Sequence, residues 1–154
     1  MNPLLQNDFI VPHTLYLTRS FKKWTGRDLL PGDFSPDGLA EKIFNAPFVV
    51  VSHGTQADPI LNYGNRTALA LWELSWDEFT RTPSRLTAEV PNREERARLL
   101  EAVTSQGFID NYAGIRISKS GRRFEISRAI VWNLVSETGE PYGQAAAFSK
   151  WKFL

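Results

Sequence analysis

The 154-residue sequence contains no cysteine, which excludes disulfide bonds, thiolate metal sites and a cysteine nucleophile. The same absence excludes a photochemical cysteine–flavin adduct. Histidine is scarce, and two histidines far apart in a chain without cysteine do not favour a zinc site. A chain without cysteine is typical of a reducing compartment, so we expect a cytoplasmic protein.

The sequence also lacks a strong charge of either sign and a long apolar run. Its formal net charge is +1, so no global field draws the protein to nucleic acid or to anionic lipid. The first residues, MNPLLQNDF, contain neither a basic leader nor an apolar segment long enough to cross a membrane. We therefore expect no signal peptide and no membrane partner.

Aromatic residues are plentiful, because five Trp, four Tyr and ten Phe make up 12% of the chain, and this indicates a compact core. The length suits a single domain. Residues 48–79, FVVVSHGTQADPILNYGNRTALALWELSWDEF, organise the chain. An apolar run, turn-forming residues and a second extended segment predict a β-hairpin, after which Asn65 opens a helix.

Helices are predicted on both sides of this hairpin in the sequence. Before it, Leu17, Phe21 and Trp24 share one helical face, and a second helix begins near residue 35. After it, Ser75 and Glu78 have the spacing of a capping box, and a further helix begins near residue 92. Three strands joined by tight turns then occupy residues 112–153, and strands joined in this way are antiparallel.

This order of elements predicts an α+β fold, a five-stranded antiparallel sheet with helices on one face. Residues 1–47 form an N-terminal helical extension and residues 48–154 form one compact unit. Arg128 falls at the same parity as the apolar residues of its strand. Either a bulge resets the register there, or Arg128 points inward to a partner.

The element order resembles the PAS fold, a small sensory and interaction module. The stretches APFVVVSHGTQADPILNYGNRTAL, PNREERARLL, GFIDNY, RISKSGRRFEI and GQAAAFSKWKFL are similar to the stand-alone bacterial MEKHLA-domain family, which is regarded as PAS-related. This resemblance covers residues 15–154 and implies a role in ligand sensing or protein contacts, with no catalytic residue transferred. Light-sensing flavin members of the PAS class carry a cysteine motif that this chain lacks, so flavin photochemistry is not expected.

Three consecutive alanines, residues 145–147, predict unfilled space on the last strand, because alanine leaves room that valine or isoleucine would fill. Either neighbouring aromatic side chains or a small-molecule ligand fill this space. The candidate ligand contacts are Trp72, Trp132, Ala146 and Phe148 as walls and Asn62, Asn65 and Arg128 as polar anchors. Asn65 has a competing role as a helix cap.

His53 directly follows an apolar strand and is the candidate residue for chemistry. A neutral imidazole at a strand end can contact a ligand, ligate haem iron or accept a proton, and Asp58 is close enough in sequence to orient it. The competing interpretation is a histidine satisfied by the turn backbone. The sequence has no Gly-x-Ser-x-Gly elbow and no phosphate-cradling glycine loop, so an enzyme using His53 is the secondary hypothesis.

The main hypothesis is a PAS-like sensor that binds a small molecule and has no catalysis of its own. The alternative is a homodimerisation or protein-interaction module, in which the N-terminal helix presents Leu17, Phe21 and Trp24 to a partner. Basic residues around the last strands could bind single-stranded nucleic acid. Acidic residues are interspersed among them, however, so solvated hairpin edges are the favoured interpretation.

Overall fold

The computed structural model describes residues 8–154, with the side chains of Val90 and Pro91 left aside. Helices and strands follow one another in the order α1 (Ile10–Thr25), α2 (Pro36–Phe44), β1 (Val49–His53), β2 (Leu61–Gly64), α3 (Arg66–Trp72), α4 (Trp76–Phe79), the 3-10 helix η2 (Ser84–Thr87), α5 (Val90–Gln106), β3 (Phe108–Ile117), β4 (Arg123–Val135), β5 (Pro141–Phe148) and β6 (Lys150–Phe153).

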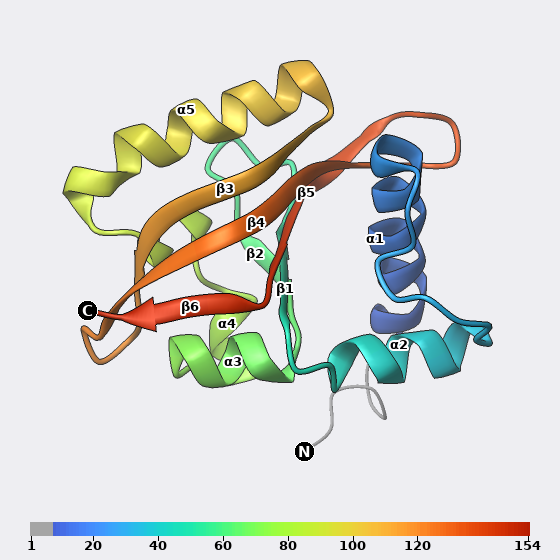
Figure 1. Cartoon of the computed structure of the whole chain (residues 1–154), viewed down its shortest axis with the longest axis horizontal. Coiled ribbons are helices and arrows are strands. Elements are labelled where there is room, and N and C mark those ends of the chain that lie inside the picture. Colours follow the sequence, from blue (N-terminus) through green and yellow to red (C-terminus); the bar gives the residue numbers. More distant parts are fainter. Residues whose placement is uncertain (1–7) are drawn as a thin grey trace.

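The strands form one antiparallel sheet in the order β2-β1-β5-β4-β3 (Figure 1), which confirms the predicted α+β fold. The first hairpin and the last strands meet in the middle of this sheet, where Val49 of β1 pairs with Phe148 of β5. The sequence predicts one continuous final strand, whereas the structure divides it into two. Both parts pair with β4, β5 along its second half and β6 along its first half.

A bulge at Arg128 resets the register of β4. Arg128 has a φ of 54° and an exposed side chain. Ile126 before it and Ala129 after it belong to the same core cluster although their parities differ. Of the two alternatives left open by the sequence, the bulge is the one observed. Because its side chain is exposed, Arg128 does not enter the interior, as its predicted role of ligand anchor requires.

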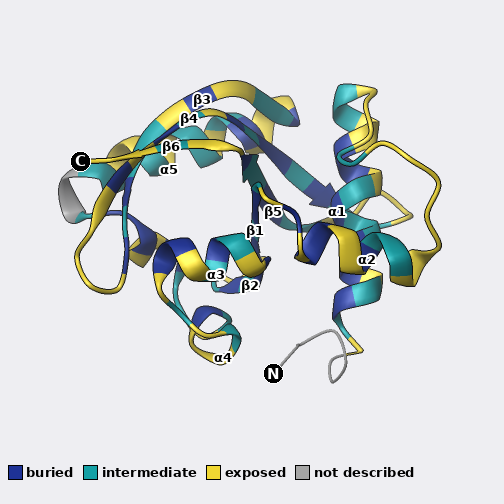
Figure 2. Cartoon of the chain, turned by 60° about the horizontal axis from the view of Figure 1, so that its bottom comes forward, coloured by how far each residue is buried: buried dark blue, intermediate teal, exposed yellow. Residues whose placement is uncertain are grey.

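Helices cover both faces of the sheet (Figures 1 and 2), whereas the sequence interpretation placed them on one face. Alternate residues of β1 belong to two different core clusters. Val49 and Val51 contact the cluster under α3, α4 and α5, whereas Val50 contacts the cluster under α1 and α2. The unbroken apolar run in β1 is typical of a strand that is buried on both sides. The N-terminal extension is thus the cover of the second face.

The apolar stripe of α1 lies on the sheet. Leu17 and Phe21 are buried, and the ring of Phe21 meets Trp132 edge-to-face with centroids 5.0 Å apart. The indole Nε1 of Trp132 donates to the Leu17 carbonyl oxygen (3.2 Å), and Nε1 of Trp24 donates to the Asn133 carbonyl oxygen (2.9 Å). These side chains serve the core of their own chain, which differs from the expected exposed interface. Apolar residues on β4 of the same chain pack against this face of α1, where the interface hypothesis expected a second molecule.

Asn65 is the cap of α3 and has no exposed surface. Its Oδ1 accepts hydrogen bonds from the backbone N–H of Ala68 and of Val50, each 3.1 Å long. Its Nδ2 donates to the carbonyl oxygens of Ile43 (3.0 Å) and Phe48 (2.8 Å). The capping role is confirmed, and the backbone groups that occupy the amide leave it no free polar atom for the predicted ligand contact.

Close approach of two strands places His53 at the edge of the α5 side of the sheet. Gly143 of β5 has a φ of 133°, and a Cβ at this position would collide with the carbonyl oxygen of His53. Only glycine fits both the backbone conformation and the contact. The next pair along the ladder is His53 and Gln144, and both side chains face α5.

Candidate ligand-binding site

A pocket with about 70 Å³ of free space lies between the sheet and the helices α3, α4, η2 and α5. Much of its wall is apolar, formed by Leu61, Trp72, Phe79, Ile126, Val131 and Phe148. Polar side chains reach it from five different elements, namely His53, Ser84, Arg96, Tyr112, Arg116 and Gln144. An apolar cavity with a few convergent polar groups is the usual form of a small-molecule site.

The structure brings four of the eight predicted ligand contacts together at this pocket, which are His53, Trp72, Ala146 and Phe148. The three alanines of β5 do not act as one unit, because successive side chains alternate between faces. Ala146 faces the pocket, whereas Ala145 and Ala147 contact the cluster under α1 and α2. The space predicted beside the three alanines is therefore divided between the two faces of the sheet.

Trp132 and Asn62 lie on the side of the sheet that carries α1. Trp132 is fully buried there, and the prediction that it lines the pocket is wrong because the bulge at Arg128 changes its parity. Asn62 accepts a hydrogen bond from the Ser52 hydroxyl (2.5 Å), which in turn lies 2.8 Å from Nε2 of His13. Asn62 thus belongs to the contact between β1 and α1.

His53 is 8% exposed, and only one of its two ring nitrogens has a hydrogen-bond partner. Nδ1 lies 3.0 Å from the Gly54 carbonyl oxygen, which can only accept, so Nδ1 carries the hydrogen and Nε2 is a bare acceptor. Nε2 is buried and has no partner in hydrogen-bonding geometry within the described residues; the Gln144 side chain lies near enough to favour the protonated ring, but its amide donates to Leu100, Thr104 and Asn133. Burial lowers the pKa of His53. The Gly54 carbonyl opposes this, the charge of Arg96 lowers the pKa again, and the Gln144 amide raises it. The ring is therefore neutral at pH 7.

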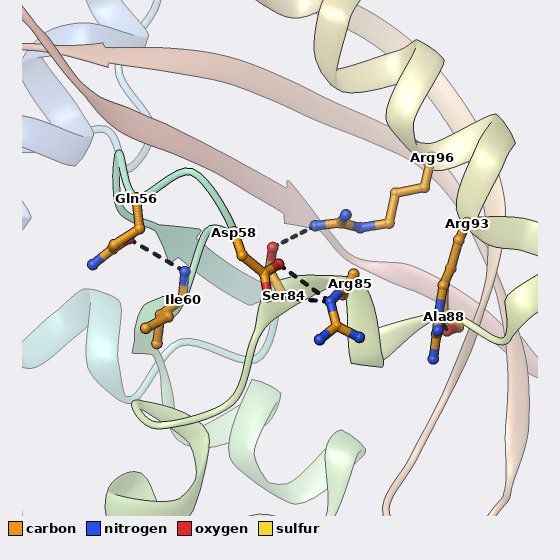
Figure 3. Close-up of polar contacts among 8 residues, drawn as sticks. All are labelled: Gln56, Asp58, Ile60, Ser84, Arg85, Ala88, Arg93 and Arg96. Atoms are coloured by element: carbon orange, nitrogen blue, oxygen red, sulfur yellow. Dashed lines mark hydrogen bonds and ion pairs between the residues drawn. The ribbon is translucent and has the colours of Figure 1, made fainter.

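Asp58 does not orient His53. Both of its carboxylate oxygens lie 3.2 Å from Nε of Arg85, on the exposed side of the β1–β2 turn (Figure 3). The turn is further held by the Gln56 side chain, which accepts from the Ile60 backbone N–H (3.3 Å). The turn-backbone interpretation of His53 is confirmed for Nδ1 and leaves Nε2 unexplained.

Trp72 presents a second unpaired polar atom at the same pocket. Its side chain is 4% exposed, and the indole N–H is buried without a partner in the described part of the chain. The ring makes edge contacts with Phe124 and Phe148, with centroids 5.3 Å and 6.3 Å away. A buried donor and a buried acceptor thus line one cavity without protein partners, although most buried polar groups are hydrogen-bonded.

Two arginines that the sequence interpretation did not single out complete the polar wall. Arg96 extends from α5, and its Nη2 donates to the Ser84 hydroxyl oxygen, 2.7 Å away (Figure 3). Arg116, on β3, is 7% exposed and donates to the carbonyl oxygen of Ile115 (2.9 Å) and the hydroxyl oxygen of Tyr112 (3.2 Å). Burial and the charge of Arg116 lower the pKa of Arg96 to about 10, so Arg96 stays charged at pH 7.

The sequence positions of both arginines indicate that their side chains face inward. Arg96 precedes Leu99, Leu100 and Val103 on the inward face of α5, and Arg116 shares the inward parity of Tyr112 on β3. Gln144, on β5, is a further polar residue that the sequence interpretation did not single out. Its Nε2 lies 3.0 Å from the Leu100 carbonyl oxygen and ties β5 to α5 beside His53.

Within residues 8–154, no group of three or more His, Asp or Glu side chains is placed to hold a metal ion. Among the helices of this described part, none is long and apolar enough to span a membrane. The site is therefore a pocket whose recognition groups are an imidazole, an indole, two guanidiniums and hydroxyls.

Solved structures of PAS and light-oxygen-voltage proteins share this fold. The PAS domain of a protein from Colwellia psychrerythraea matches with a TM-score of 0.60 and 17% identity over 75% of this chain and 92% of that chain. An RNA-binding light-oxygen-voltage receptor matches with a TM-score of 0.64 and 17% identity over 78% of this chain and 33% of that one. A light-oxygen-voltage domain studied with a flavin analogue matches with a TM-score of 0.59 and 14% identity, over 75% and 84% of the two chains.

A flavin does not fit the residues of this pocket. The free space of about 70 Å³ is far below the roughly 300–1,000 Å³ of pockets that enclose drug-sized ligands. Trp72, Phe124 and Phe148 fill the centre of the cluster through their mutual edge contacts. The likeness to light-oxygen-voltage domains is therefore a likeness of fold.

Curated relatives match the chain along most of its length. The homeobox-leucine zipper protein HOX32 of Oryza sativa subsp. japonica is 23% identical over 145 residues, which is 92% of this chain and 17% of HOX32. ATHB-9 of Arabidopsis thaliana, also a homeobox-leucine zipper protein, is 24% identical over 144 residues, or 90% of this chain and 17% of ATHB-9. The chain thus spans about a sixth of the length of these relatives. The MEKHLA domain matches residues 11–153, nearly the whole sequence, and the chain belongs to the MEKHLA-domain family.

Proposed function

We propose that this chain is a PAS-like sensory module that binds a small molecule in the pocket between the sheet and α5, without catalysis of its own. The observation that carries this proposal is the pair of unpartnered polar atoms, Nε2 of His53 and Nε1 of Trp72, at one cavity. Each such buried atom costs about 1–3 kcal/mol when unsatisfied. A bound molecule that hydrogen-bonds to them offsets this cost.

The arrangement around His53 favours binding over catalysis. Ser52, its neighbour in the sequence, faces the opposite side of the sheet and hydrogen-bonds to Asn62. Asp58 is engaged with Arg85. Neither residue can therefore form a proton relay with His53, which requires direct hydrogen bonds between the members.

The test uses two alanines that are adjacent on β5 and face opposite sides of the sheet. In Ala146→Val, the added methyl groups enter the pocket, whereas in Ala147→Val the same change is made on the α1 side. The probes are propanol, propionamide, acetate and propionate, and the readout is the indole N–H resonance of Trp72, assigned with Trp72→Phe. Circular dichroism checks that both valine variants are folded.

We expect at least one probe to shift the Trp72 resonance in the wild-type chain. Ala146→Val should weaken that binding about tenfold or more, because even small pockets lose affinity when a methylene-sized space is filled, while Ala147→Val should change it little. If none of the four probes shifts the resonance, or if both variants behave alike, the binding function is contradicted.

A further inference from the structure

Two positive charges meet at the pocket from different elements. Arg96 comes from α5 and Arg116 from β3, and both line the cavity that His53 and Trp72 face. They are close enough for the charge of Arg116 to act on Arg96. Like charges brought together in a partly desolvated site oppose folding unless a counter-charge joins them.

Neither guanidinium forms an ion pair within the described residues. The protein acceptors that they contact are hydroxyl or carbonyl oxygens, those of Ser84 for Arg96 and of Ile115 and Tyr112 for Arg116. These contacts leave N–H donors on both side chains, since a guanidinium has about five of them.

The carboxylates of this region are used elsewhere. Asp58, whose charge acts on Arg96 from a distance, pairs with Arg85 at 3.2 Å. Glu95 accepts a hydrogen bond from the Tyr112 hydroxyl (3.0 Å), and its contact with Arg116 runs through that hydroxyl. The two arginines therefore lack a direct anionic partner of their own.

Gly114 lets the Tyr112 and Arg116 side chains lie against the β3 backbone. A Cβ at this position would collide with the Tyr112 hydroxyl and would lie 3.1 Å from Nη1 of Arg116. The neighbouring wall is apolar, and includes Ile126, Val131 and Phe148. The lining of the cavity therefore combines two positively charged side chains with apolar ones.

The size of the cavity limits what can occupy it. Its free space of about 70 Å³ is about half of the roughly 150 Å³ that accommodates benzene in an engineered apolar cavity. Carboxylates match the forked geometry of guanidiniums and form short charge-assisted hydrogen bonds with them. We infer that the pocket binds a short-chain monocarboxylate, with its anionic group at Arg96 and Arg116 and its hydrocarbon part against Ile126, Val131 and Phe148. This inference rests on the proposed function of the same pocket.

The experiment compares acetate, propionate and butyrate with their amides at constant ionic strength, by titration of the full chain. Propionate should bind at least about tenfold more tightly than propionamide, which has nearly the same shape without the charge. Arg96→Gln should remove that preference and leave the affinity for propionamide within about threefold. Arg85→Gln is the matched control, because Arg85 is a half-exposed arginine of the same region that lies outside the pocket.

The outcomes separate this inference from the proposed function. If propionamide binds as well as propionate, and binding still depends on Ala146, the anion is excluded and the binding function stands. If neither propionate nor propionamide binds, the inference fails, and the binding function fails as well only if the other probes also leave the Trp72 resonance unchanged. Equal competition by inorganic phosphate would also overturn the inference, because phosphate has no apolar part. Should Arg96→Gln fail to fold, Arg96→Lys serves as the second variant, and we expect it to weaken propionate binding because lysine lacks the forked donors of arginine.

Discussion

Nε2 of His13 lies 2.8 Å from the Ser52 hydroxyl oxygen, and this fully buried contact joins α1 to β1. The hydroxyl donates its hydrogen to Oδ1 of Asn62, so His13 must donate through Nε2 and keep Nδ1 unprotonated. Burial lowers the pKa of His13 to about 3. The attachment of α1 therefore depends on a neutral imidazole.

The free energy of unfolding should decrease as the pH falls below about 6.5. The unfolded chain binds a proton at His13 near that pH, whereas the folded chain does so only near pH 3, so acid favours the unfolded state between these values. The expected slope is about 1.4 kcal/mol per pH unit for His13 alone. Burial acts on the pKa of His53 in the same direction. Urea unfolding at pH 7.0, 6.0 and 5.0, chosen as roughly spaced points, measures the slope.

The variant His13→Gln identifies the source of this slope. Glutamine can still donate to Ser52 but does not titrate, so the dependence on pH should become shallower. Glu73 and Glu78, whose pKa values are lowered to about 2 by hydrogen bonds from Ser118 and Ser120 and from Lys119, contribute only at pH values below about 4.5. An unchanged slope in His13→Gln between pH 7 and 5 would rule out His13 as the cause.

Replacing Phe21 by alanine should destabilise the fold instead of changing its association. The ring is buried against Trp132, and removing a buried aromatic ring costs about 3–5 kcal/mol. Phe34→Ala is the control, because Phe34 is 37% exposed and should change stability by less than about 0.5 kcal/mol. Urea unfolding and sedimentation velocity together distinguish a core role from an interface role, and a dimer lost at unchanged stability would support the interface.

Asn65→Ala should cost about 2–4 kcal/mol, because four backbone groups from α3, β1 and the end of α2 lose their partner together. Asn65→Asp keeps the accepting oxygen and should cost less. Asn45→Ala removes an exposed amide that donates to Glu41 and serves as the control. Equal losses at Asn65 and Asn45 would show that the buried network contributes little.

Gly143→Ala should be more harmful than Gly139→Ala. Both glycines have positive φ, which costs about 1–2 kcal/mol for alanine. At Gly139 the added methyl group meets open space, whereas at Gly143 it collides with the His53 carbonyl oxygen and separates β1 from β5. Thermal unfolding compares the stabilities of the two variants. Similar melting temperatures would mean that β1 and β5 can move apart at Gly143 without loss of stability.

The fold was predictable where local chemistry decides it. Ser75 and Glu78 form both bonds of the predicted capping box, and Gly107 ends α5 with a positive φ as its sequence position indicates. The pairing of the early hairpin with the last strand also follows from the order of elements, as the contact of Val51 with Ala146 confirms. Turns and caps depend on a few neighbouring residues, so the sequence carries them directly.

The candidate site was only partly predictable. Trp72 and Ala146 follow from apolar patterns, but Trp132 was misplaced because the alternation of a strand does not show where a bulge reverses it. Arg96 and Arg116 were missed because a charged side chain is usually on the surface, and its burial becomes visible only when α5 and β3 are brought together. Polar recognition thus depends on contacts between segments far apart in the chain.

The side of the sheet facing away from the pocket is already occupied by α1 and α2. Another chain cannot bind there unless these helices detach. Their detachment would expose Val50, Trp132 and Leu134 to solvent at the same time. The start of the β2 edge is also covered, because the Leu61 N–H donates to the Thr82 carbonyl oxygen. The surfaces that remain for contact with another chain are therefore the outer surfaces of the helices and the edges of β3 and β6.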